Sequence, residues 1–231
     1  MPPRKPAAED EIKVIKLRRI GEAIVEVPIE GTTPVIPHKW SEKALKLMRE
    51  KQMAEAGSLS ARREPKNPDE EAEQSCYWLD LPDGRHAAVP AVSFKAATVG
   101  GCRFYSGITM VQARLMFFVE GQGDEQLVPL DGKWAMREDT PRISGGGPDL
   151  RDRMAVWPWS AVLRIRYVPS LIGPDSVFAL VDAAGRLGVG DWRPASPKSN
   201  TGTYGQFRVS ASSNATGTPV PALELAGAVK S

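Results

Sequence analysis

The chain has 231 residues, of which 42% are hydrophobic and 25% charged, with a formal net charge of +2. This length suits one large domain or two small ones, and the near-balanced charge excludes polyanion binding that relies on net charge alone. The 2 cysteines exclude a disulfide scaffold or a cysteine-rich metal site, and the apolar runs are too short to span a bilayer.

The first half of the chain predicts two short strand-like pieces around Gly21, within residues 12–30, followed by two helices. Residues 1–11 are rich in proline and charge, and we expect them to be disordered. Apolar and polar residues alternate over 23–29, which predicts a half-buried strand. Helical spacing predicts a helix over 41–57, with Ser41 as its N-cap and Gly57 after its end. Residues 57–90 read as an exposed excursion with a Pro-Asp-Gly turn, and 91–104 as a short helix ended by glycines.

The second half predicts strands around one clear helix. The stretch "ITMVQARLMFFVEG", residues 108–121, is typical of a long strand, and 120–160 read as a second, irregular excursion. "AVLRIRYV" at 161–168 predicts another strand. The apolar stripe of 173–188, with a proline in its first turn, predicts an amphipathic helix. The short stretch 205–210 predicts the last strand.

This order of elements predicts an α+β fold of the ferredoxin-like type. Strand, helix, strand, strand, helix, strand is the βαββαβ arrangement, an antiparallel sheet with its helices on one face. We expect one domain over 12–210, with insertions at 57–90 and 120–160. Residues 211–231 are of low complexity, and we expect a disordered tail.

Arginines alternate with apolar residues in three of the predicted strands. Because side chains alternate across a strand, these arginines can share the sheet face away from the helices. One interpretation is a solvated polar face. The other is a basic platform for a phosphodiester backbone. The arginines concerned are Arg114, Arg164, Arg166 and Arg208.

A glycine-rich stretch, "GVGDWRPASPKSNTGTYGQFRV", precedes the last predicted strand. Glycines permit positive φ and close backbone approach, so this loop either turns tightly or lies against something. In the second interpretation Arg193 and Lys198 supply charge to a bound strand, and Trp192 is available for stacking on a base. The glycines that would allow the approach are Gly188, Gly190, Gly202 and Gly205.

The segment from Gly185 to Val209 resembles the glycine-rich loop of the RAMP superfamily, the RNA-binding subunits of CRISPR effector complexes that include the Cas7-like backbone proteins. The resemblance implies a ferredoxin-like core and a strand of RNA as ligand. RAMP endonucleases rely on a catalytic histidine or a similar set, whereas His38 and His86 both lie outside this loop. The resemblance therefore implies a binding subunit and not a nuclease. With "IEGTTPVIPHKWSEKA", the chain is also similar to an uncharacterised family of phage and prophage proteins.

Other chemistry finds little support in the sequence. The glycines of "GRLGVGDWRP" follow a helix and not a strand, so they form no dinucleotide fingerprint, and "RISGGGPD" lacks the lysine of a phosphate loop. Cys76 and His86 are a weak candidate for a nucleophile and its base, since cysteine usually behaves as a buried apolar residue. We expect no cofactor, metal or catalytic residue.

The function predicted from these patterns is non-catalytic binding of single-stranded DNA or RNA, in a protein of phage or prophage type. We expect it to act in the cytoplasm of a bacterial host, without a membrane, as a homo-oligomer or filament if subunits repeat along the strand. The alternative is a phage structural or assembly protein whose excursions contact other subunits.

Overall fold

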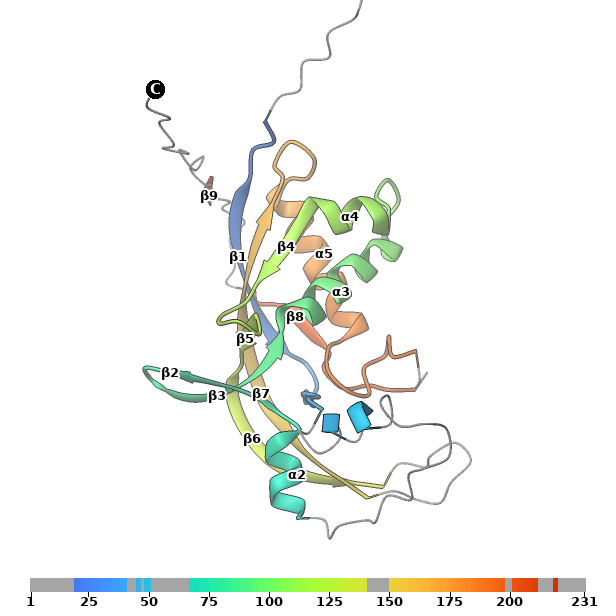
Figure 1. Cartoon of the computed structure of the whole chain (residues 1–231). Helices are drawn as coiled ribbons and strands as arrows, with labels where there is room; N and C mark the ends of the chain where they lie inside the picture. Colours follow the sequence, from blue (N-terminus) through green and yellow to red (C-terminus); the bar gives the residue numbers. More distant parts are fainter. Residues whose placement is uncertain are drawn as a thin grey trace, which may run out of the picture.

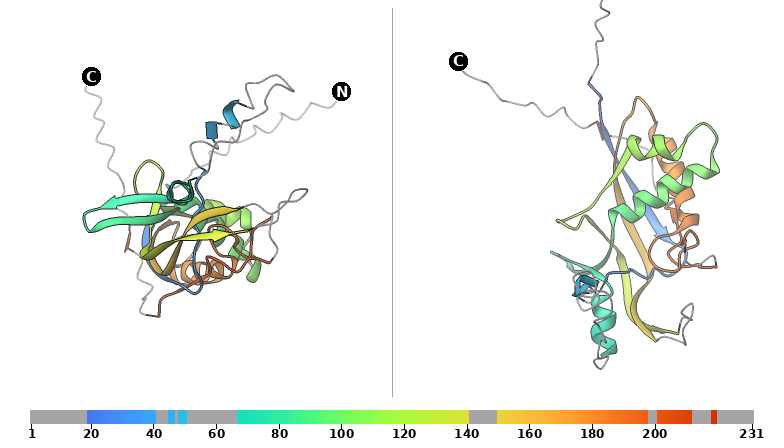
Figure 2. Two further views of the ribbon diagram at one scale, coloured as in Figure 1. Left: turned by 90° about the horizontal axis from the view of Figure 1, so that it is seen from below. Right: turned by 45° about the vertical axis from the view of Figure 1, so that its right-hand side comes forward.

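The computed structural model describes residues 19–40, 45–46, 48–50, 67–140, 150–197, 201–211 and 218–219. The chain forms a mixed α/β fold in which a long antiparallel sheet carries the larger helices on one side (Figure 1). A smaller antiparallel sheet projects from the lower part of this body (Figures 1 and 2). The antiparallel α+β class predicted from the sequence is confirmed.

The long sheet is built around β1 (Ala23–Gly31) and β7 (Arg151–Tyr167), which pair from Ala23–Tyr167 to Glu30–Ser160. The strand order is β4-β7-β1-β8, with β4 at Phe117–Glu120 and β8 at Phe207–Val209. The far half of β7 pairs with β6 (Asp131–Asp139), and β9 (Thr218–Pro219) pairs with the start of β1. Residues 218–219 fall in the segment 211–231, where a disordered tail is expected; most of that segment lies outside the described residues, and the expectation stays a prediction.

Two helices cover the inner face of the sheet. These are α3 (Ala91–Gly101) and α5 (Pro174–Leu187), which contact one another along the sheet. Proline stands in the first turn of α5, where its missing N–H has no partner to lose, and the stripe Val177, Leu180, Val181 and Ala184 is buried. Both helices lie where the sequence predicted them.

The core lies between these helices and the sheet. The predicted alternation in β1 is confirmed, because Ala23, Val25, Val27 and Ile29 are all buried. Leu163 and Ile165 of β7 face the same way, and Phe94 of α3 meets Phe207 of β8 edge to face at 5.9 Å. The opposite face of these strands therefore carries the polar residues that alternate with this set.

The two predicted excursions contain regular structure in their described parts. Residues 67–90 form α2 (Pro68–Gln74) and a hairpin of β2 (Tyr77–Leu81) and β3 (Gly84–Pro90), which turns at the predicted Pro-Asp-Gly. Residues 120–160 supply β5 (Leu127–Pro129), β6 and the first ten positions of β7. The expectation of irregular structure over 120–160 was wrong for the described residues of that range.

The predicted strand over 108–121 was also wrong. Residues Met110–Met116 form helix α4, and only Phe117–Glu120 form a strand. Thr109 and Gln112 make a capping box in which each side chain bonds the other residue's backbone N–H. Val111 and Leu115, which would share one face with Ala113 in a strand, are 66% and 70% exposed. A short 3-10 helix, η1 (Cys102–Phe104), links α3 to this segment.

The predicted helix over 41–57 lies mostly outside the described residues. Of that range the structure describes 45–46 and 48–50, which are helical. The predicted N-terminal segment 1–11 lies outside them entirely.

Candidate nucleic-acid interface

Three of the four predicted basic residues do lie on the outer face of the long sheet. Arg164 and Arg166 project from β7 and Arg208 from β8, on the side opposite the buried core residues. Arg114 does not join them, because it lies on α4 and not on a strand. Its expected place on the sheet was wrong.

The outer face of the sheet is not a cationic surface, however. Arg164 bonds Glu120 at 2.9 Å and contacts Glu26 at 3.4 Å, and Arg208 bonds Glu30 at 2.6 Å. Arg166 bonds Glu120 at 3.1 Å and Glu22 at 2.8 Å, and these carboxylates raise its pKa. We call this group of seven side chains the sheet face: Glu22, Glu26, Glu30, Glu120, Arg164, Arg166 and Arg208.

On the sheet face the carboxylates outnumber the guanidinium groups. A polyanion that approached here would have to displace glutamates that already satisfy the arginines, and it would be repelled by those glutamates. The binding role predicted for Arg164, Arg166 and Arg208 stays a prediction, and their geometry gives it no support.

The described parts of the glycine-rich loop, residues 188–197 and 201–206, fold against the protein's own backbone. Gly205 donates from its N–H to Pro34 and accepts at its C=O from Val189, at 2.8 and 3.0 Å. Gly188, Gly190 and Gly205 have φ of 70, 77 and 67°, a region that favours glycine. A Cβ on Gly190 would run into the carbonyl of Ile36, and one on Gly202 into that of Trp192. The close approach predicted for these glycines is real, but the partner is the chain itself.

Trp192 and its neighbours show the same internal packing. The Trp192 ring lies 5.8 Å from that of Tyr204 and is faced by the guanidinium of Arg153 at 5.1 Å. The residue that was predicted to stack on a base is half-buried and makes these contacts within the chain. Lys198 lies outside the described residues.

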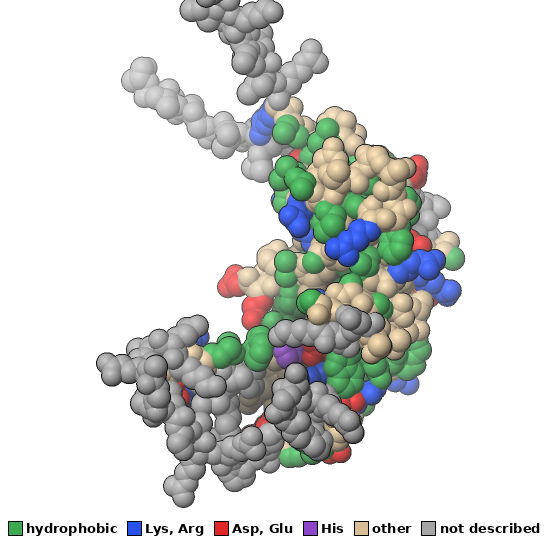
Figure 3. All heavy atoms as spheres, turned by 90° about the vertical axis from the view of Figure 1, so that its right-hand side faces the viewer, with side chains coloured by type: hydrophobic (Ala, Val, Ile, Leu, Met, Phe, Trp, Pro, Cys, Tyr) green, Lys and Arg blue, Asp and Glu red, His purple; other side chains and the backbone are tan. Residues whose placement is uncertain are grey.

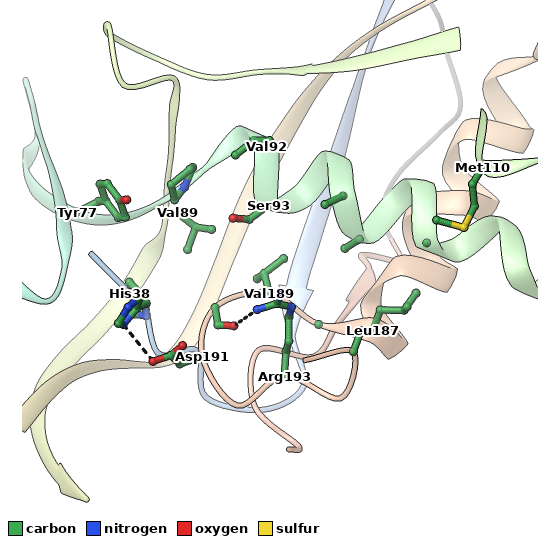
Figure 4. Close-up of a pocket in the computed structure, with 18 of the residues that line it drawn as sticks. His38, Tyr77, Val89, Val92, Ser93, Met110, Leu187, Val189, Asp191 and Arg193 are labelled. Atoms are coloured by element: carbon green, nitrogen blue, oxygen red, sulfur yellow. Dashed lines mark hydrogen bonds and ion pairs between the residues drawn. The ribbon is translucent and has the colours of Figure 1, made fainter. Parts of the chain in front are cut away.

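A groove of about 540 Å³ runs between α3 and the glycine-rich loop. Figure 4 shows α3 with Val92 and Ser93 on one wall, and Val189, Asp191 and Arg193 of the loop on the other. Tyr77 and His38 lie at one end, and Met110 lies at the other. The helical side of the molecule in Figure 3 carries several Lys and Arg side chains and a hollow in which a histidine is visible.

The arginines of this groove differ from those of the sheet face. Arg103 follows α3 in η1, and Arg193 bonds only the neutral carbonyl of Gly190, at 2.8 Å. Neither has an ion pair with any carboxylate in the described parts of the chain. Their positive charge is therefore available to a ligand, and they line the groove from η1, just after α3, and from the glycine-rich loop.

Asp191, the acidic residue that lines the groove, is already neutralised. Its carboxylate accepts from Nδ1 of His38 at 3.1 Å, and Nη1 of the buried Arg153 lies 2.9 Å away in an ion pair. Burial alone would raise the pKa of Asp191, but the hydrogen bond from His38 and the charge of Arg153 outweigh it and hold this pKa below its ordinary value. The carboxylate thus stays ionised without making the groove anionic.

Sequence reasoning missed most of this groove. The sequence predicts no binding role for His38, Tyr77, Ser93 or Arg103, all of which line the groove. No local pattern marks them, because the groove brings together residues from segments that are distant along the chain. Arg193 and the neighbouring glycines were found, since glycine content marks the loop directly.

The Cys76 and His86 pair has no arrangement for nucleophilic chemistry. Burial raises the pKa of the Cys76 thiol to about 12, so the thiol stays protonated, and its S–H donates to the carbonyl of Tyr77. His86 faces Asp83 and Asp131 instead, at 3.2 and 3.5 Å. Among the residues that the structure describes, no group of three or more His, Cys, Asp or Glu is placed to hold a metal ion. None of the described helices is long and apolar enough to cross a membrane.

No protein-family profile matches the chain, and no curated protein resembles it in sequence, so the expected phage family finds no counterpart. Among solved structures, the chain is similar to a chain of the Type III-B Cmr-beta complex bound to cognate target RNA, with a TM-score of 0.45 and 12% identity. That match covers 87% of this chain, which spans 61% of the Cmr-beta chain. The chain is also similar to Cmr6 from Pyrococcus furiosus, with a TM-score of 0.36, 10% identity, and coverage of 83% of this chain and 100% of Cmr6.

Proposed function

We propose that the chain binds single-stranded nucleic acid, DNA or RNA, in the groove between α3 and the glycine-rich loop. The observation that carries this proposal is the contrast in ion pairing. Arg103 and Arg193 line the groove without an ion pair to any carboxylate of the described residues, whereas Arg164, Arg166 and Arg208 are held by glutamates. Guanidinium groups are well suited to phosphate oxygens because they present several N–H donors in one plane.

The groove also offers surfaces for the other parts of a nucleotide. Val92, Met110 and Leu187 supply apolar contacts, and the hydroxyl groups of Tyr77 and Ser93 supply hydrogen-bonding partners. Such a lining binds backbone and base faces with little sequence preference. We propose binding without cleavage, and an oligonucleotide incubated with the protein is expected to remain intact.

The core fits the resemblance to RAMP proteins. In the proposed correspondence, β1, α3, β4, β7, α5 and β8 are the six elements of a ferredoxin-like core, since the strand order is β4-β7-β1-β8 and all three pairings are antiparallel. The glycine-rich loop then lies between the second core helix and the last strand, as in that superfamily.

Charge reversal at the two sites tests this function. With a fluorescent single-stranded 20-mer, Arg103→Glu/Arg193→Glu is expected to weaken binding about tenfold or more, because two charge-assisted contacts are lost. The dependence of log K on log salt should flatten by about 1.4, or 0.7 for each phosphate contact. Fluorescence anisotropy between low and high salt measures both quantities.

The matched control is Arg164→Glu/Arg166→Glu, which reverses the same number of charges on the sheet face. It is expected to change affinity much less than the groove variant does. If the control abolishes binding while the groove variant retains it, the sheet face is the site and the proposal is wrong. If the unaltered chain binds no single strand even at low salt, nucleic-acid binding itself is refuted.

A second function, protein–protein assembly, is favoured by one observation. Phe104, Val111 and Leu115, on η1 and α4, are 57, 66 and 70% exposed, which is unusual for large apolar side chains on neighbouring elements. Oligomers that persist at high salt, together with an absence of nucleic-acid binding, would support this alternative.

A further inference from the structure

The backbone on both sides of His38 is fixed by hydrogen bonds to other elements. The C=O of Ile36 accepts from the N–H of Asp191 at 2.9 Å, and the N–H of Lys39 donates to Ser75 at 2.8 Å. The imidazole also meets the ring of Trp40 edge to face at 5.2 Å. His38 is therefore held in one position at the mouth of the groove (Figure 4).

The contact between Nδ1 of His38 and Asp191 determines whether Nε2, the other ring nitrogen, acts as a hydrogen-bond donor or acceptor. Because an ionised carboxylate only accepts, Nδ1 of His38 carries the proton. In the neutral ring Nε2 is then an acceptor, and in the cation it is a donor. No hydrogen-bond partner for Nε2 is present in the described part of the chain. A phosphate oxygen also only accepts, so it can bond Nε2 only when the ring is protonated.

We infer that His38 and Arg193 form a phosphate-binding subsite that is complete only when His38 is protonated. The inference rests on the proposed function and adds to it a dependence on pH. Arg193 keeps a permanent charge on the loop wall of the same groove, and the ring of His38 adds a second charge and a directed donor as pH falls.

The groups around His38 are consistent with this dependence. Asp191 contacts Nδ1 of the ring at 3.1 Å, and Arg153 pairs with the same carboxylate at 2.9 Å. On the other sides lie the phenol of Tyr77, whose pKa is raised by burial, and the ammonium of Lys39 over the Tyr77 ring. A phosphate bound at Nε2 would add a negative charge beside the ring, which favours the protonated form.

Affinity for labelled oligo-dT at constant ionic strength tests the inference, because neither thymine nor the phosphodiester changes charge between about pH 5.5 and 8. The affinity is expected to rise about tenfold as pH falls over this range, the size of one charge-assisted hydrogen bond. The affinity of His38→Gln for oligo-dT should not change with pH and should equal that of the unaltered chain when His38 is neutral. His86→Gln, which removes the chain's other histidine, should retain the full dependence.

The ring itself provides a second readout. With 2 histidines in the chain, the Cε1–H proton signal of His38 is assigned by comparison with His86→Gln. Its ionisation midpoint should rise by about one pH unit when oligo-dT is added, which corresponds to the tenfold change in affinity.

The possible results separate the two proposals. Binding that is equally tight at all pH values, or that keeps its pH dependence in His38→Gln, overturns the subsite and leaves the groove function standing. Absence of binding at every pH overturns the proposed function, and the subsite with it. Binding whose pH dependence disappears only in His38→Gln supports both.

Discussion

Replacing Gly205 with alanine is expected to destabilise the fold by about 4 kcal/mol, the sum of a strained positive φ and an overpacked contact. Gly205 has φ of 67°, and a Cβ there would collide with the carbonyl of Val189. Its own N–H and C=O join the loop to Pro34 and to Val189, so the chain cannot move aside without losing these bonds. Thermal or urea unfolding followed by circular dichroism measures the loss.

Gly107→Ala separates the two contributions. Gly107 also has positive φ, 88°, but a Cβ there meets nothing within 4 Å. It should cost only about 1 kcal/mol, from backbone strain alone. Equal losses at the two positions would mean that the loop does not pack against the chain as described.

The second large effect is expected for Asp191→Ala, at about 3–5 kcal/mol, because it leaves a buried guanidinium without its counter-charge. Arg153 is only 4% exposed, and burial lowers its pKa, while the charge of Asp191 acts in the opposite direction. The control is Glu30→Ala, which removes the partner of the exposed Arg208 and should cost about 0–1 kcal/mol.

The loss in Asp191→Ala should also depend on pH. Because the folded-state pKa of Asp191 lies below its ordinary value of 3.8, its ionised form stabilises the fold fully above that value. This contribution disappears as pH falls through the lower folded-state pKa. The difference in unfolding free energy between the variant and the unaltered chain should therefore shrink in acid. A difference that instead grows below pH 3.8 would contradict the ion pair.

The elements that sequence predicted well are those with one unambiguous period. In β1 every second residue is apolar. In α5 a proline in the first turn and a single apolar stripe both indicate a helix over the same residues. The segment 110–116 was misassigned because Val111, Ala113 and Leu115 alternate as in a strand. Thr109 and Gln112 have the spacing of a capping box, which instead predicts the start of a helix, and the structure has a helix there.

The ion pairs of the sheet face could not be predicted from the sequence, for a different reason. Alternation correctly placed Arg164 and Arg166 on the outer face, and it placed Glu26 and Glu30 on one face of β1. Which of these residues stand opposite one another depends on strand register, and Glu26 opposite Arg164 is fixed only in the folded sheet. The lining of the groove could not be predicted for a similar reason, because its residues come from distant segments. His38 follows β1 and Asp191 follows α5, and the fold brings them together.

The central claim is that a nucleic-acid strand lies in the groove and not across the sheet face. Photocrosslinking of single strands that carry a photoreactive uracil, followed by peptide mass spectrometry, tests it directly. We predict crosslinks at Tyr77, Met110 and the loop around Arg193, which line the groove. Crosslinks concentrated at Phe118, whose ring lies beneath Arg166 on the outer side of the sheet, would contradict it.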